Sequence, residues 1–174
     1  MKTIWKGQQG FSLIEILVAM VITALISTAI TGAIFQVFAS DRVSNDIIAI
    51  RQVQTAGDWI SVDALQAQNV DDTWGQPDDR GFPFTLTWTD WDNNDNKVEY
   101  DLIAMPLPGT MKQLQRQQTG TGGSSTRIVA QYLDDSESQI SYNTSAVKVI
   151  FQITATVGEQ TASRVYEVKP RPLS

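Results

Sequence analysis

A long uncharged run near the N-terminus limits the folds open to this chain. The 25 positions from Ile16 to Ser40 carry no charge and are mostly apolar. An α-helix rises about 1.5 Å per residue, so this run can cross a hydrocarbon core of roughly 30 Å. The sequence therefore predicts a membrane-spanning helix over residues 11–39. Lys2 and Lys6 precede it and favour a cytoplasmic N-terminus, because positive charge is retained inside.

Two simpler kinds of N-terminal segment compete with this interpretation. A cleaved secretory signal has an apolar core of about 7–15 residues, which is shorter than the run seen here. A plain membrane anchor stays open, but it does not explain Glu15 at the head of the run. A charge near the membrane centre costs roughly 2.5 kcal/mol or more, so Glu15 needs either a partner or a position among the lipid headgroups.

The composition excludes several classes of function. Asp and Glu number 19 against 13 Lys and Arg, a net charge of −6, so nucleic acid is not expected as a partner. The chain has no His and no Cys, which removes Ser-His-Asp and Cys-His catalysis, Cys/His zinc sites and disulfides. We predict no enzymatic activity, and we interpret the acidic residues of the Gly/Pro-rich loop as a solvated surface rather than a catalytic pair: Asp71, Asp72, Asp78 and Asp79.

The residues before the run form a recognisable motif. Gly10-Phe11-Ser12-Leu13-Ile14-Glu15 follows a short basic leader and opens the apolar helix. This arrangement resembles the class III signal of type IV pilins and type II secretion pseudopilins. The resemblance implies that a membrane-embedded prepilin peptidase removes leader 1–10 by cutting between Gly10 and Phe11 and methylates the new N-terminus of Phe11. It also implies that the Glu15 carboxylate pairs with the N-terminal ammonium of a neighbouring subunit.

The same resemblance implies a structural role and a location. The chain would be a subunit of a type IV pilus or a type II secretion pseudopilus, with sibling pilins, prepilin peptidase and an inner-membrane assembly platform as partners. It would lie in the inner membrane, in contact with lipid, before entering an extracytoplasmic filament in the periplasm or at the cell surface. Short stretches at 59–67, 98–102 and 165–172 resemble minor pilins and J-type minor pseudopilins. A major pilin, or a membrane-anchored extracytoplasmic binding module, is the alternative.

The helix is expected to continue beyond the membrane over residues 40–70. Apolar or small residues recur there at spacings of three and four, which describe one helical stripe. Gly32 and Gly57 are weak points, each less favourable than Ala by about 1 kcal/mol. The predicted stripe consists of Val43, Ile47, Ile50, Val53, Gly57, Ile60, Ala64 and Ala67. The residues expected to dock the helix on its own domain are Trp59, Ile60, Val62 and Leu65.

Residues 71–174 are predicted to form an extracytoplasmic β-rich domain. Apolar residues alternate with polar ones at 84–89 and 98–102, on either side of a hairpin loop at 90–96. Residues 106–125 are expected to form a long loop, followed by strands at 127–133, 146–157 and 162–168 with a turn at 158–160. Val147, Val149, Phe151, Ile153 and Val157 are expected to face inward. The predicted fold class is α+β, a long N-terminal helix packed on a C-terminal antiparallel β-sheet.

The hairpin loop is also a weak candidate for a metal site. Asp90, Asp92, Asn94 and Asn96 alternate oxygen ligands as a calcium loop does. Asp95 stands where an EF-hand needs glycine, and strands rather than helices flank the loop. Asn and Asp are also the residues that tight turns prefer. We therefore predict a solvated turn and no cofactor, and keep calcium as the alternative.

Overall fold

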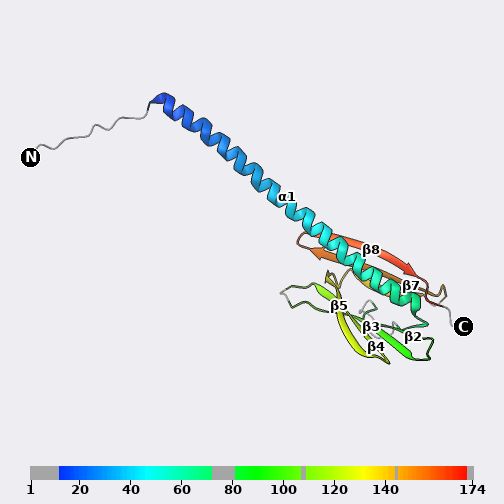
Figure 1. Ribbon diagram of the computed structural model, residues 1–174. Helices are drawn as coiled ribbons and strands as arrows, with labels where there is room; N and C mark the ends of the chain where they lie inside the picture. Colours follow the sequence, from blue (N-terminus) through cyan, green and yellow to red (C-terminus); the bar gives the residue numbers. More distant parts are fainter. Residues whose placement is uncertain (1–11, 72–80, 107–108, 144, 172–174) are drawn as a thin grey trace, which may run out of the picture. The chain divides into compact units, whose positions relative to one another are not determined.

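A computed structural model describes residues 12–71, 81–106, 109–143 and 145–171, and it confirms the predicted α+β architecture. The chain divides into two compact units, Met1–Asp41 and Arg42–Ser174. The elements are α1 (Leu13–Gln66), β1 (Asn69–Asp71), β2 (Phe84–Thr89), β3 (Asp95–Ala104), β4 (Lys112–Gly120), β5 (Gly123–Leu133), β6 (Gln139–Asn143), β7 (Lys148–Val157) and β8 (Gln160–Val168) (Figure 1).

The strands form one antiparallel sheet in the second unit. Its order is β1-β2-β3-β4-β5-β7-β6, and β8 pairs along β7 from Val149↔Val168 to Val157↔Gln160. The other edge of β7 pairs with β6 from Lys148 to Gln152, and with β5 at Leu133↔Ala155. The C-terminal half of α1 packs against this sheet, as Figure 1 shows for β7 and β8.

The predicted strands at 84–89 and 98–102 are confirmed as β2 and part of β3, but the alternation is not strict: Thr85 is also buried, and Trp88 and Leu102 are only partly buried. Phe84 and Leu86 of β2 and Val98 and Tyr100 of β3 are fully buried. The rings of Phe84 and Tyr100 stack with their centroids 5.1 Å apart. The pattern could be predicted because a half-buried strand presents every second side chain to the core.

The predicted helical stripe is correct only in its C-terminal part. Val43, Ile47 and Ile50 are exposed, so this part of the prediction is wrong. The helix face that contacts the sheet is instead made mostly of small side chains, which let the helix backbone approach the strands closely. These buried residues are Ala49, Val53, Ala56, Gly57, Ile60, Ala64 and, just past the helix, Ala67.

The end of α1 also differs from the prediction. Ile60 is buried and Trp59 partly buried as expected, but Val62 and Leu65 are 52% and 58% exposed and do not dock on the domain. The helix ends at Gln66 instead of continuing to residue 70. The backbone then turns to pair with β2, and residues 69–71 become β1.

The prediction of a long loop at 106–125 is wrong, because this segment contains β4 and the start of β5. The strand was hidden by its composition: Leu114 and Arg116 point inward, while glutamines fill most of the remaining positions. Strand β4 is held by pairing with β3 from Lys97↔Thr119 to Ala104↔Lys112 and with β5 on its other side. Backbone pairing thus compensates for a weak apolar pattern.

The last strands begin at slightly different positions from those predicted. Strand β7 begins at Lys148, and Val147 lies before it with a positive φ of 49° and 38% exposure, so its predicted inward position is wrong. The remaining four predicted inward residues of β7 are buried. The turn into β8 consists of Gly158 and Glu159, and Gly158 has a φ of 60° that suits glycine. The short strand β6 was not predicted.

Candidate functional site

Helix α1 begins at Leu13 and carries Glu15, the charged residue of the motif, in its first turn. Gly10 and Phe11 lie outside the described residues, and the description starts at Ser12. The backbone N–H of Glu15 donates to the Ser12 hydroxyl at 3.3 Å, and the Ser12 N–H donates to the Glu15 carboxylate at 3.4 Å. This reciprocal pair is a capping box. Sequence reasoning missed it, although Ser-x-x-Glu before an apolar run is its usual signal.

The capping box leaves most of the Glu15 carboxylate free to bind a cation. A carboxylate offers about four lone-pair positions, and the Ser12 N–H occupies one of them. The helix N-terminus carries a partial positive charge that favours an acidic residue there. No Lys or Arg occurs from residue 12 to residue 41, so the N-terminal unit supplies no side-chain cation for Glu15 within its described part.

The polar side chains within the apolar run hydrogen-bond to the helix itself. Thr23, Thr28 and Thr31 each donate from the hydroxyl to the backbone carbonyl four residues earlier, at 2.8–2.9 Å. Below Glu15 the small side chains of Ala19, Thr23 and Ser27 form part of a shallow groove along one face of the helix.

The apolar side chains in the described part of this unit are exposed. Leu13 and Phe35, for example, are 84% and 71% exposed. Among the described residues, α1 is long and apolar enough to cross a membrane by length and composition, and the qualifying stretch has no buried residue. Such a surface needs either lipid or other helices around it, because exposed apolar area of this extent is unfavourable in water.

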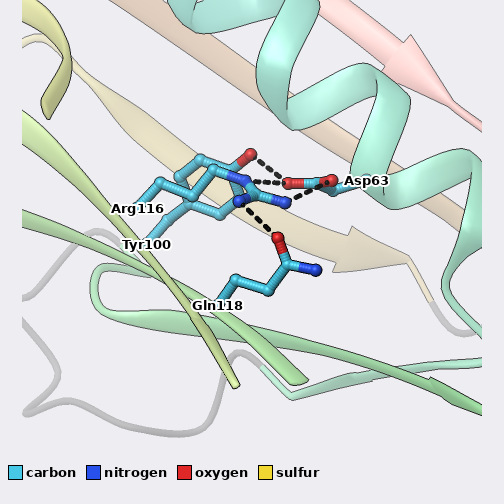
Figure 2. Close-up of polar contacts among 4 residues, drawn as sticks. All are labelled: Asp63, Tyr100, Arg116 and Gln118. Atoms are coloured by element: carbon cyan, nitrogen blue, oxygen red, sulfur yellow. Dashed lines mark hydrogen bonds and ion pairs between the residues drawn. The ribbon is translucent and has the colours of Figure 1, made fainter. Parts of the chain in front are cut away.

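A second polar cluster joins α1 to the middle of the sheet (Figure 2). Asp63 of α1 is 4% exposed, and its carboxylate accepts hydrogen bonds from the Tyr100 hydroxyl at 2.5 Å and from Arg116 at 2.7 and 3.0 Å. Arg116 also donates to the Gln118 side chain at 2.9 Å. The Arg116 guanidinium lies over the Trp59 ring, 5.1 Å from its centroid. Sequence reasoning did not identify this cluster.

The chemistry of the cluster is that of a structural tie. Burial, with Asp63 beside it, raises the pKa of the Tyr100 hydroxyl well above its ordinary value, so the hydroxyl stays protonated and donates. The hydrogen bonds to Asp63 raise the pKa of Arg116. Both oxygens of the Asp63 carboxylate are already bonded within the chain. The arrangement therefore fixes α1 on β3 and β4 rather than presenting a reactive group.

The candidate calcium residues form a hydrogen-bonded turn between β2 and β3. The Asp90 carboxylate accepts from the backbone N–H groups of Asp92 and Asn94 at 3.0 and 2.9 Å. It also accepts from the side-chain amides of Asn94 and Asn96 at 3.3 and 3.5 Å. The Asn94 hydrogen bond is the main cause of the lowered pKa of Asp90. The geometry supports the turn interpretation, because the two Asn amides point their N–H groups at Asp90.

The other acidic candidates are placed only in part. Asp71 belongs to β1, whereas Asp72, Asp78 and Asp79 lie outside the described residues. Within the described ranges no three acidic side chains come together closely enough to hold a metal ion. The expectation of no cofactor, and the calcium alternative, both remain predictions.

Comparison with known families identifies one segment of the chain. Residues 5–31 match a family model described as the prokaryotic N-terminal methylation motif. The match includes Gly10, Phe11 and Glu15, and it supports a prepilin signal of the type IV pilin kind. It points to a structural class of protein that is processed by prepilin peptidase and assembles with other pilin subunits. No curated protein and no solved structure matches the chain.

Proposed function

We propose that this protein is a minor subunit of a type IV pilus or a type II secretion pseudopilus. The observation that carries the proposal is the methylation motif at residues 5–31, placed directly over the start of an apolar helix headed by Glu15. The methylation motif supports a precursor of the pilin or pseudopilin type. The helix packed on an antiparallel sheet is a pilin-like fold.

Processing creates the charge that the helix lacks. Cleavage between Gly10 and Phe11 removes the basic leader and leaves an ammonium on Phe11, which methylation keeps cationic. Inside an apolar helix bundle an unpaired ion is strongly disfavoured, whereas an ammonium and a carboxylate in contact compensate each other. The carboxylate of Glu15 accepts from Ser12 and keeps further acceptor positions, so it can receive the ammonium of a neighbouring subunit.

The apolar helix then serves in two surroundings. Before assembly the exposed side chains from Leu13 to Phe38 lie in inner-membrane lipid, with Lys2 and Lys6 holding the N-terminus in the cytoplasm. After extraction by the assembly platform the same side chains pack against equivalent helices in an extracytoplasmic filament. The Glu15 pair sets the axial register, since an offset between neighbouring helices leaves both charges unpaired.

Processing can be tested by intact-mass measurement of the membrane-extracted protein. The expected mass corresponds to loss of residues 1–10 and addition of one methyl group. Gly10→Leu should leave the precursor uncut, because the bulky side chain replaces the glycine at the cleaved bond. The matched control is Gly7→Ala in the same leader, which should be processed normally. Trimming of the Gly10→Leu protein at the same bond would refute the prepilin assignment and favour a membrane-anchored binding module.

The subunit type needs a second measurement. We expect the processed protein in sheared filaments at a small fraction of the most abundant pilin, quantified by mass spectrometry against labelled peptides. A protein that forms the bulk of the filament would instead be a major pilin. Recovery of the filament on the cell surface, or only in the periplasm, separates a pilus from a secretion pseudopilus.

A further inference from the structure

The tip of the β2–β3 hairpin carries an unusual surface residue. Trp91 is 91% exposed, the highest value among the large exposed hydrophobic side chains of the described residues. A tryptophan left in water at a loop tip forfeits the burial that normally stabilises such a side chain. Trp91 therefore calls for an explanation other than packing within the chain.

The turn that holds Trp91 is rigid. Asp90 and Asp92 flank it, and the Asp90 carboxylate accepts four hydrogen bonds from within the turn. The Thr89 hydroxyl donates to the Asp95 carboxylate at 3.1 Å and closes the hairpin below it. An aromatic ring on a fixed turn loses little conformational freedom when a ligand packs on it, which favours binding.

Three separate segments meet beside this ring. A pocket of about 640 Å³ is lined by the end of α1, the β2–β3 hairpin and the segment after β8. Its apolar lining consists of Leu65, Trp88 and Trp91. The Arg171 guanidinium lies 5.4 Å from the Trp91 ring centroid, and the Arg171 backbone N–H donates to the Ala67 carbonyl at 3.0 Å. The pocket volume lies within the usual range of ligand sites, about 300–1,000 Å³.

The polar lining of the pocket has unused hydrogen-bonding groups. The side chains of Gln66 and Asn93 are exposed and form no hydrogen bond with any described residue. The Arg171 guanidinium lies over the Trp91 ring and forms no ion pair or hydrogen bond with any described residue. These groups surround the ring with donors, and the two amides add acceptors.

We propose that this pocket binds a pyranose oligosaccharide whose ring stacks on Trp91. A β-1,4-linked pyranose has an apolar face of C–H groups and a rim of equatorial hydroxyls. The apolar face fits the tryptophan ring, and the hydroxyls fit Gln66, Asn93 and Arg171. A protein-binding hot spot is normally desolvated and shielded at the centre of its patch, whereas this ring is surrounded by polar side chains. The site goes beyond the proposed function and does not depend on processing.

The test uses the full chain purified in a detergent without a sugar headgroup, since a glycosidic detergent would compete. Chitohexaose and cellohexaose are titrated separately by isothermal calorimetry. We expect saturable binding of at least one of them with a Kd of about 0.1–1 mM. Trp91→Ala should weaken it at least tenfold, equal to about 1.4 kcal/mol, whereas Trp91→Tyr should keep part of the affinity. Arg171→Gln should weaken binding about threefold, in keeping with a direct contact.

Matched controls separate stacking from unfolding. Val165→Ala removes an exposed apolar side chain on β8 that lines no part of the pocket, and it should bind as the wild type does. Trp91→Ala should keep the wild-type melting temperature, because the side chain is almost fully solvated. Absence of saturable binding of both sugars up to 10 mM, or unchanged binding by Trp91→Ala, overturns the proposal. Self-association that requires Trp91, without sugar binding, also overturns it and assigns the surface to a protein contact.

Discussion

Removing Asp63 should destabilise the second unit more than any neighbouring polar substitution on α1. Asp63→Ala leaves the Arg116 charge without its carboxylate and the Tyr100 hydroxyl without its acceptor, in a site where Asp63 and Arg116 are 4% and 9% exposed. Breaking a buried ion pair by removing one partner costs about 3–5 kcal/mol. We expect the lower end, about 3 kcal/mol, because Arg116 keeps its hydrogen bond to Gln118 and its contact with Trp59.

The measurement is urea unfolding of a fragment that spans Arg42 to Ser174, the second compact unit. With an m-value near 2 kcal/mol/M, a loss of about 3 kcal/mol lowers the urea midpoint by about 1.5 M. Asp58→Ala is the matched control, because Asp58 is an exposed aspartate on the same helix; it should change stability by less than about 0.5 kcal/mol. A loss below 1 kcal/mol for Asp63→Ala would refute the reasoning.

A double-mutant cycle distinguishes the ion pair from general disruption. Arg116→Met alone should also destabilise, since it leaves the Asp63 carboxylate with Tyr100 as its remaining partner in the cluster. The combination of Asp63→Ala with Arg116→Met removes both charges and should lose less stability than the sum of the two single losses. A coupling energy of about 2 kcal/mol is expected for groups in direct contact. Simple additivity would show that the two side chains stabilise the fold independently.

Four further outcomes are expected. Gly57→Ala should destabilise the 42–174 fragment by about 1–3 kcal/mol in urea, because the new Cβ would overlap the Tyr166 ring; a gain in stability would contradict this contact. Since the raised pKa of Tyr100 keeps its proton in the folded state, the free energy of unfolding should be constant with respect to this group below about pH 10 and fall above it. Tyr100→Phe should make that alkaline decline shallower in urea titrations, and an unchanged slope would refute the assignment. Glu15→Leu should be inserted and processed but depleted from sheared filaments, as measured by immunoblot of both fractions; normal incorporation would remove its assembly role. Calcium should change the melting temperature of the fragment by less than about 2 °C, and a saturable rise abolished by Asp92→Ala would restore the metal site.

Local sequence patterns were sufficient to predict those elements whose apolar residues follow a regular pattern. The run from Ile16 to Ser40 predicted a membrane-spanning helix, and the structure has an exposed apolar helix there. The alternation at 84–89 and 98–102 predicted β2 and β3. The loop between them was predicted because Asp and Asn suit tight turns, and the Asp90 carboxylate indeed organises it. In each case the residues that determine the element follow one another directly in the sequence.

Long-range causes could not be predicted in the same way. Strand β4 has few apolar residues, and its inward Arg116 looks like a solvent-facing charge until Asp63, distant in sequence, is brought beside it. The buried helix face was also missed in part, because Ala49 and Ala56 are weak signals compared with the exposed Val43 and Ile47. The prediction relied on the larger apolar residues. In the structure the buried helix face consists mostly of small residues, which let the helix lie close to the sheet.

The two glycines of α1 show that the same residue type can have different structural roles along one helix. By sequence, Gly32 and Gly57 are equal weak points. The structure distinguishes them: Tyr166 packs on Gly57 so closely that no side chain fits, whereas a Cβ at Gly32 meets nothing within 4 Å in the described part of the chain. The cost of Gly57 is therefore compensated by a contact inside the protein, including the hydrogen bond from the Tyr166 hydroxyl to the Val53 carbonyl at 3.2 Å. Gly32 has no such compensation among the described residues. In a helix whose surroundings are lipid or sibling subunits, a glycine without an internal contact is consistent with close approach of a neighbouring helix, the setting in which small residues are favoured.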